Sequence, residues 1–287
     1  MQIVTDRAAD FSSDQLKGLK INFAPLILTL DGISYRSGED IQPEDFYRLL
    51  EQSNDYPTTS QPSAGDFADL YRKLAVDDPE ILSIHISSGL SGTLSAAQAG
   101  AQMVPEARVH FFDTKTLSCP EAWIVEAAAI GLQAGKSLDE IINYLEKLRD
   151  QVQGMFTLTT LKYLVHGGRI SHMKGLLASL LNIKPIIGVG KEDGKYISFG
   201  QELTLKRAMN KMVEQVSEWC VPGSTIRVQL LHGNNLTGTD YLKEKLVQIY
   251  NVIWTPTTAI GPVLGAHTGS GLVGMAVAPA NLFTEKS

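Results

Sequence analysis

The sequence predicts an α/β protein of two domains, a mostly parallel α/β domain followed by an α+β domain. The chain has 287 residues, more than the about 100–200 residues of most single domains, and one large domain is the alternative. In the first half, short β-branched segments alternate with longer segments of helical periodicity, as in strands joined by crossover helices. In the second half the order is less regular, and an Asp-Gly turn between two strand patterns indicates antiparallel pairing.

The first half is predicted to form a sheet covered by helices. Its strands are predicted at residues 1–5, 81–87 and 108–114, and its covering helices at residues 43–53 and 65–76. A further helix is predicted after Ser137, because its Ser-x-x-Glu spacing to Glu140 satisfies two free amides at a helix start. Gly154 is expected to cap the end of that helix, so we divide the chain into residues 1–154 and 155–287.

The second half is predicted to mix strands and helices. Its strands are predicted at residues 155–160, 225–233 and 272–278, with two more within 184–199. Its helices are predicted at residues 161–168, 205–220 and 238–250. The sequence shows no internal repeat of fixed period and no low-complexity segment.

Composition argues against several classes of protein. The net charge of -6 does not fit a protein that mainly binds nucleic acid, since such proteins usually carry a clustered basic excess. Cys119 and Cys220 are too few for a disulfide scaffold and are expected to be buried free thiols, which fits a reducing cytoplasm. The N-terminal residues lack the pattern of a signal peptide. The apolar segments 123–132 and 176–183 are shorter than the about 20 residues of a membrane span, so we expect a cytoplasmic protein without an integral membrane segment.

The segment SSGLSGT (87–93) joins a strand pattern to an alanine-rich helix pattern. Amides at a helix N-terminus, together with hydroxyl side chains, can hold a carboxylate or a phosphate. The simpler interpretation is that Ser91 or Thr93 caps the helix. The Gly-x-Ser-x-Gly motif of a hydrolase is absent, because glycine directly follows Ser91 and Thr93 takes the last position.

Three other segments could also contact a ligand. The loop TTSQPS (58–63) is rich in hydroxyl groups, and capping accounts for Ser63 alone. Arg169 follows two glycines, and its planar guanidinium suits a carboxylate or phosphate, although a solvated turn is the alternative. His267 lies in the glycine-rich segment 261–271, which we expect to form a tight loop. The Gly-x-Gly-x-x-Gly pattern of residues 269–274 is no dinucleotide site, since too little chain follows for a helix and a second strand.

No metal or nucleotide site is predicted. The remaining histidines lack metal-ligand spacing and are interpreted as core or surface residues. The sequence also lacks the Gly-x-x-x-x-Gly-Lys-Ser/Thr loop of ATP-binding proteins.

Four motifs together resemble one known family. In order, they are TTSQPSAGDF (58–67), SSGLSGT (87–93), HGGRIS (166–171) and GPVLGAHTGSG (261–271). Their order and spacing, with the opening IVTDRAADF, resemble the DegV family over nearly the whole chain. These bacterial fatty acid-binding proteins serve as the lipid-carrying subunits of fatty acid kinase.

The resemblance implies a non-catalytic protein of two domains with a long-chain fatty acid buried between them. A separate kinase with a dihydroxyacetone-kinase-like domain would phosphorylate the carboxyl group, and ATP and Mg would belong to that kinase. No covalently bound cofactor is expected. By the resemblance, the carboxyl group contacts Thr59, Ser91 and the amide of Gly92, whereas Arg169 and His267 lie near the head group, where they position the phosphate or face the kinase.

The sequence departs from the family pattern at three places. Residues 119–121, Cys-Pro-Glu, stand where small glycine-rich residues are usual, which could reshape the wall of the tunnel. His166 replaces a common lysine and Ser270 a common proline, which could alter the kinase-facing surface.

A buried acyl chain would supply enough free energy for binding. Fifteen methylenes at roughly 0.8 kcal/mol each give a gross transfer free energy of about 12 kcal/mol. Candidate tunnel-lining residues, each also explained by ordinary core packing, are Leu176, Leu177, Leu180, Leu181 and Ile183.

Two other functions stay open at this point. A serine esterase would use Ser91 with His267. A small-molecule kinase subunit would engage a carbonyl substrate through His267, but it would depend on a partner for the nucleotide.

Overall fold

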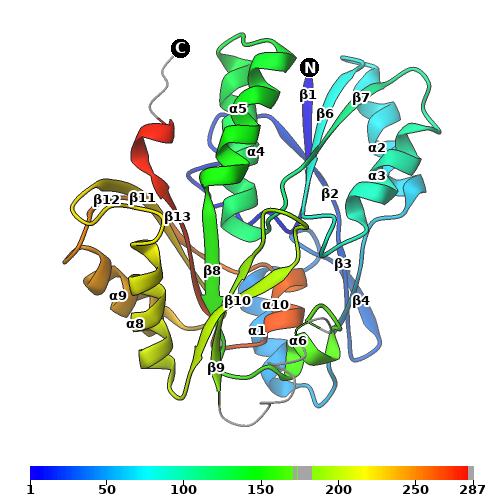
Figure 1. The fold of residues 1–287 in the computed structure, drawn as a ribbon. Coiled ribbons are helices and arrows are strands. Elements are labelled where there is room, and N and C mark those ends of the chain that lie inside the picture. The colour runs from blue at the N-terminus through cyan, green and yellow to red at the C-terminus, as the bar shows by residue number, and fades with distance from the viewer. Residues whose placement is uncertain (171–172, 174–182, 284–287) are drawn as a thin grey trace.

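The computed structural model describes residues 1–170, 173 and 183–283, and its first sheet is parallel throughout (Figure 1). The strands are β1 (Gln2–Asp6), β2 (Ile21–Ala24), β6 (Glu80–His85) and β7 (Arg108–Asp113), in the order β2-β1-β6-β7. Every neighbouring pair in this sheet is parallel. The predicted parallel α/β arrangement of the first half is confirmed.

Helices cover both faces of this sheet. They are α2 (Ala64–Ala75), α3 (Thr93–Ala101), α4 (Ser118–Gln133) and α5 (Leu138–Gln151), whereas α1 (Pro43–Gln52) packs on α10 (Pro262–Thr268) and the small sheet described below. Figure 1 shows α2 and α3 on one side and α4 and α5 on the other. The capping boxes at Ser63 and Ser137 start α2 and α5, as the spacing from Ser137 to Glu140 predicts.

The second sheet is mixed. Its strands are β8 (Gln153–Thr157), β9 (Lys184–Val189), β10 (Tyr196–Glu202), β11 (Thr225–His232), β12 (Asn251–Ala259) and β13 (Val273–Pro279), in the order β10-β9-β8-β13-β11-β12. β11 and β12 are parallel, and the other pairs are antiparallel. Helices α8 (Leu205–Val216) and α9 (Leu236–Leu246) pack against it, which confirms an α+β second half.

A small antiparallel sheet completes the described fold. It contains β3 (Ile27–Leu30), β4 (Ile33–Arg36) and β5 (Thr58–Ser60). The short helices are α6 (Lys162–His166), α10 (Pro262–Thr268) and the 3-10 helix η1 (Ala280–Phe283). α10 packs against β3, β5, α1 and α6, so a late segment of the chain covers an early one.

Helix α4 connects the two main sheets. It contacts β1 of the first sheet and both β8 and β13 of the second. Most of its residues are buried, because the helix is apolar on nearly all sides. The largest core cluster accordingly contains residues from both halves, such as Ile84, Trp123 and Ile187. The division after residue 154 stays a prediction.

Gly154 does not cap α5, contrary to the sequence-based expectation. The helix ends at Gln151, and Val152 is already extended and leads into β8. Glycine is needed at residue 154 for close packing, since a Cβ there would lie 2.6 Å from Cγ of Pro120.

The expectation that His267 lies in a tight loop is also wrong. Residues 262–268 form α10, with Pro262 at its first position, where proline is favoured. Gly265 lies inside this helix. A side chain does not fit there, because a Cβ at Gly265 would lie 2.5 Å from Cε1 of Phe46 on α1.

Candidate functional site: a polar cavity joined to an apolar one

One cavity brings together four of the five residues predicted to lie at a ligand head group. Its wall contains Thr59 and Ser91 from the first half of the chain and Arg169 and His267 from the second. The cavity contains about 500 Å³ of space, part of it open solvent. Segments that are distant in the sequence therefore meet around one space.

Thr59 and His267 are joined by a short hydrogen bond. Thr59 Oγ1 lies 2.7 Å from His267 Nε2. Strand β5 holds Thr59 opposite Leu28 of β3, and α10 packs against both strands. The small sheet and α10 together fix this pair.

His267 is neutral at pH 7. Burial, with a smaller contribution from the positive charges of Arg169 and His166, lowers the pKa of His267 to about 4. Its Nδ1 is buried and has no hydrogen-bond partner among the described residues. Because a buried N–H without an acceptor is rarer than a buried acceptor without a donor, we assign the proton to Nε2. Thr59 then accepts from Nε2 and keeps its own proton for a ligand.

Ser91 lies between β6 and α3, one residue before the N-cap Gly92, and its side chain bonds to the first residue of that helix. Ser91 Oγ accepts from the backbone N–H of Thr93 at 3.2 Å and pairs with Thr93 Oγ1 at 2.8 Å. When the Thr93 hydroxyl donates, both acceptor positions of Ser91 Oγ are used and its own proton is available to a ligand. The contact of Ser91 with Thr93 and the binding of a ligand are therefore compatible.

Gly92 lies beside the polar cavity and is the N-cap residue of α3. A Cβ at Gly92 would lie 2.5 Å from Oε1 of Gln61, and Gln61 lines the cavity. The absence of a side chain at Gly92 lets Gln61, which directly follows β5, approach the start of α3.

Arg169 supplies a positive charge at the mouth of the cavity. It follows Gly168, whose φ of 74° lies in the left-handed region. One guanidinium nitrogen, Nη1, donates to the carbonyl of Gly167 at 2.6 Å, and the side chain is exposed. An exposed guanidinium can reach both a bound anion and a protein that docks at the cavity.

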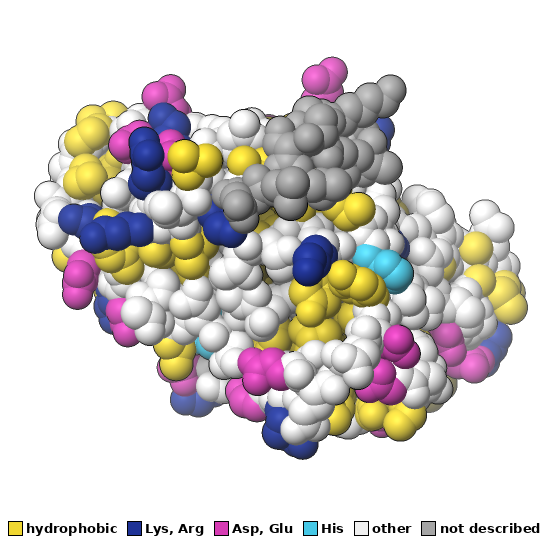
Figure 2. All heavy atoms as spheres, turned by 90° about the horizontal axis from the view of Figure 1, so that it is seen from below, with side chains coloured by type: hydrophobic (Ala, Val, Ile, Leu, Met, Phe, Trp, Pro, Cys, Tyr) yellow, Lys and Arg dark blue, Asp and Glu magenta, His cyan; other side chains and the backbone are white. Residues whose placement is uncertain are grey.

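Aromatic side chains gather around α6, the helix that shortly precedes Arg169. Tyr56 stacks on His166 with ring centroids 4.6 Å apart and meets Tyr163 edge-on at 5.4 Å. Figure 2 shows hydrophobic side chains gathered on the lower face of the molecule beside a basic side chain and a histidine.

An apolar cavity adjoins the polar one. It contains about 470 Å³ of space, part of it open solvent, and is lined by residues such as Met155, Phe156 and Leu272. Residues common to the walls of both cavities are Leu117, Tyr196 and Leu264. The pair thus offers hydroxyl donors and a cation at one end and hydrocarbon at the other, which suits an amphiphilic anion.

Sequence reasoning missed most of the apolar wall. Four of the predicted lining residues, Leu176, Leu177, Leu180 and Leu181, lie outside the described residues, and Ile183 packs against the largest core cluster. The actual lining residues come in short runs from several distant segments, such as residues 154–156 and 188–189, so no single stretch of sequence carries their pattern. Of the Cys-Pro-Glu segment, Pro120 lines the apolar cavity, whereas Cys119 and Glu121 are not part of its wall.

The buried side chain of Asp10 joins two segments that contribute to the cavity walls, the start of α4 and the start of α10. Its carboxylate accepts from Ser118 Oγ at 2.6 Å and from the backbone N–H of Gly261 at 2.9 Å. Ser118 lines the apolar cavity, and Gly261 begins the helix that carries His267. Burial raises the pKa of Asp10 to about 7, and these two hydrogen bonds oppose the shift.

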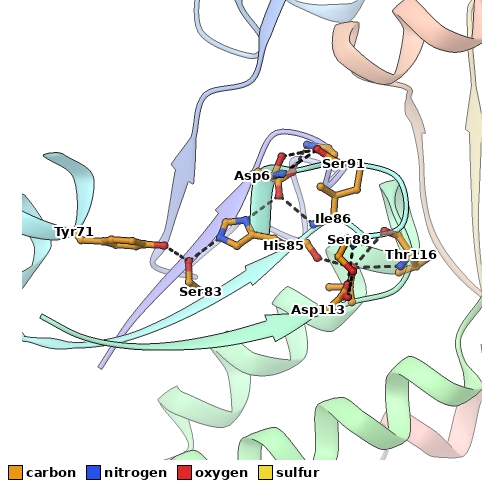
Figure 3. A network of polar contacts seen from close by, with 12 residues as sticks. Asp6, Tyr71, Ser83, His85, Ile86, Ser88, Ser91, Asp113 and Thr116 are labelled. Carbon is orange, nitrogen blue, oxygen red and sulfur yellow. Dashed lines mark hydrogen bonds and ion pairs between the residues drawn. The ribbon is translucent and has the colours of Figure 1, made fainter. Parts of the chain in front are cut away.

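A second polar network lies at the end of β6, next to the segment 87–93 that contains Ser91 (Figure 3). Tyr71 donates to or accepts from Ser83 at 2.8 Å, Ser83 lies 2.7 Å from His85 Nε2, and His85 Nδ1 lies 2.9 Å from Asp6. The order of Ser83, His85 and Asp6 is that of a hydrolase triad, but all three side chains are fully buried. Asp6 also accepts from the backbone N–H of Ile86 at 3.1 Å, so the network holds the strand end before Ser91.

Metal binding and membrane insertion find no support in the described residues. There, no group of His, Cys, Asp and Glu side chains is arranged to hold a metal ion. Within the same ranges, no helix combines the length and the apolar character of a membrane span. Cys119 and Cys220 are buried free thiols, as expected.

Comparison with known proteins identifies close relatives. The family model described as an uncharacterised protein of the DegV family matches residues 1–280. A DegV domain-containing protein of Staphylococcus aureus is 34% identical over 275 residues, which cover 96% of this chain and 97% of that protein.

Solved structures are similar over the same extent. A DegV family protein from Thermus thermophilus, described by its fatty acid binding, has a TM-score of 0.88 at 31% identity and covers 97% of this chain and 99% of its own. DegV of Bacillus subtilis, described as a fatty acid binding protein, has a TM-score of 0.87 at 29% identity, with coverages of 96% and 98%.

Proposed function

Since this chain belongs to the DegV family, we propose that it binds a long-chain fatty acid and presents its carboxyl group to a separate ATP-dependent kinase. The carboxylate would accept hydrogen bonds from Thr59 and Ser91 in the polar cavity. The acyl chain would occupy the apolar cavity. The observation that carries the proposal is the junction of these two cavities at Leu117, Tyr196 and Leu264.

The contacts of the polar cavity favour binding over hydrolysis. Among the described residues, Ser91 Oγ is bonded to Thr93, and His267 Nε2 is bonded to Thr59. A serine esterase needs a base on its nucleophile, and a histidine that carries its proton on Nε2 cannot accept one there. Hydroxyl groups whose protons are available suit an ionised carboxylate, because charge-assisted hydrogen bonds are roughly twice as strong as neutral ones.

Native mass spectrometry of the purified protein tests the proposal. We expect an added mass that acid releases and that lipid analysis identifies as one or more long-chain fatty acids. A protein that carries no fatty acid, and takes up none on incubation, would contradict it. Turnover of simple esters with loss of activity on treatment with a serine-directed phosphonate would instead support the esterase.

The partner in this proposal is a fatty acid kinase with a dihydroxyacetone-kinase-like domain, which supplies ATP and Mg in the cytoplasm. The role of this chain would be to deliver the fatty acid and remove the acyl-phosphate. Arg169 would act at this step, since its guanidinium is exposed at the cavity mouth and suits phosphate oxygens. The aromatic group of Tyr56, Tyr163 and His166 would contribute to the kinase-facing surface.

Arg169→Ala should reduce kinase-dependent acyl-phosphate formation more than fatty acid binding. The hydroxyl groups that hold the carboxylate remain in this variant, whereas the cation for the phosphate is removed. We expect roughly a tenfold or larger loss of rate, with affinity changed by less than about threefold. Arg207→Ala, which removes an exposed guanidinium from α8, is the control. An equal loss of rate and affinity would contradict this separation of roles.

A further inference from the structure

The turn between β9 and β10 meets the segment that carries Ser91. We call residues 190–195 the hairpin turn and residues 86–92 the serine loop. Ser87 Oγ donates to the carbonyl of Gly194 at 2.7 Å, and Ser87 is fully buried. Lys115, which follows β7 beside the serine loop, donates to the carbonyl of Glu192 in the same turn at 2.5 Å. The second half of the chain therefore holds the serine loop of the first.

The approach is so close that only glycine fits on either side. A Cβ at Gly89 would lie 2.4 Å from the carbonyl oxygen of Asp193. A Cβ at Gly194 would lie 2.1 Å from Ser87 Oγ. Gly194 also has a φ of 69°, which the turn requires. Two glycines from different halves of the chain thus make the contact.

Ser87 links this contact to Ser91. The carbonyl of Ser87 accepts the backbone N–H groups of Leu90 and Ser91, each at 3.0 Å. The N–H of Ser87 donates to the carbonyl of Thr116 at 2.8 Å. Ser87 thus bonds to the hairpin turn through its side chain and to the amide of Ser91 through its carbonyl. A shift of Ser87 therefore moves Ser91.

We propose that the hairpin turn is a latch that sets the position of Ser91, with Gly194 and Ser87 as positioning residues for the carboxyl group. The inference rests on the proposed fatty acid binding. It adds that residues outside both cavities set the position of the Ser91 hydroxyl group that would hold the carboxylate. Neither Gly194 nor Ser87 lines a cavity wall. Their effect on affinity passes through the serine loop.

Gly194→Ala tests the latch through the difference between an acid and an alcohol. We expect affinity for a long-chain fatty acid to fall by about tenfold, since the added Cβ displaces Ser87. Affinity for the primary alcohol of the same chain length should change by less than about threefold, because the alcohol depends mainly on the apolar cavity. Equal losses for acid and alcohol, or no loss for the acid, would overturn the proposal.

Two further variants separate the contact from backbone strain. Gly135→Ala introduces alanine at a φ of 74° with nothing within 4 Å, so it should leave acid affinity unchanged. Ser87→Ala combined with Gly194→Ala removes Oγ, and the nearest remaining side-chain atom, Cβ of residue 87, then lies 3.4 Å away. The double variant should bind the acid within about threefold of Ser87→Ala alone. Failure of this rescue would overturn the proposal.

Hydrogen exchange provides a readout that needs no ligand. Gly194→Ala should speed exchange of the Leu90 and Ser91 amides, and Gly135→Ala should not. Unchanged exchange in Gly194→Ala would refute the latch. If the wild-type protein bound no fatty acid while exchange responded as expected, the proposed function would fail and the latch would stand.

Discussion

Ser91→Ala should lower the affinity for a long-chain fatty acid by about ten- to a hundredfold while the protein remains folded. A hydrogen bond to a charged group contributes about 1.5–3 kcal/mol, and this substitution removes one of two hydroxyl donors to the carboxylate. The fold should persist, because losing the hydrogen bond from the Thr93 N–H to Ser91 Oγ costs only about 1 kcal/mol. Titration calorimetry with the acid, and circular dichroism for the fold, measure the two effects.

The matched control for this variant is Ser95→Ala. Ser95 lies on the same helix, α3, but its side chain is exposed and lines neither cavity. Its affinity should equal that of the wild-type protein. If Ser91→Ala also bound with unchanged affinity, Ser91 would not hold the carboxylate.

Asp10→Asn should make the protein progressively more stable than the wild type as the pH rises. Burial raises the pKa of Asp10 from 3.8 to about 7 in the folded protein. The folded state therefore keeps a proton that the unfolded state loses, so this stability is fully present below pH 3.8 and is lost as pH rises through about 7. At 1.36 kcal/mol per pKa unit, the loss amounts to roughly 4 kcal/mol.

Asparagine has no proton to lose and can keep both contacts, since its oxygen can accept from Gly261 and its amide can donate to Ser118 Oγ. Urea unfolding from pH 4 to pH 8 gives the difference in unfolding free energy between variant and wild type. That difference should grow by about 4 kcal/mol over this range. Asp240→Asn, at an exposed position, is the control. A constant difference for Asp10→Asn would mean that Asp10 stays ionised in the folded protein.

Local patterns predicted much of the fold because each of these elements is determined by its own residues. The parallel strands β1, β6 and β7 are short apolar runs, and the capping box at Ser137 is a local hydrogen-bond pattern. The predicted end of α5 was wrong because residue 154 is glycine for close packing against Pro120, which is distant in the sequence. The small sheet of β3, β4 and β5 escaped detection because strands of three or four residues carry little periodic signal.

The candidate site was predictable in its residue types but not in its pairings. The hydroxyl-rich motifs and the family resemblance indicated Thr59, Ser91, Arg169 and His267, and the structure gathers them around one cavity. The bond between Thr59 and His267 spans 208 residues, and only the packing of α10 on β5 creates it. Asp10 escaped attention because its burial and its contact with Gly261 arise from tertiary structure.

A crystal structure with a long-chain fatty acid that carries a terminal bromine tests the central claim most directly. Anomalous scattering locates the bromine and so gives the direction of the chain. We expect carboxyl oxygens about 3 Å from Ser91 Oγ and Thr59 Oγ1, with the bromine among the apolar residues around Met155 and Leu272. A bromine in the polar cavity, or a ligand bound instead in the separate cavity beside Trp123 and Phe283, would contradict the account.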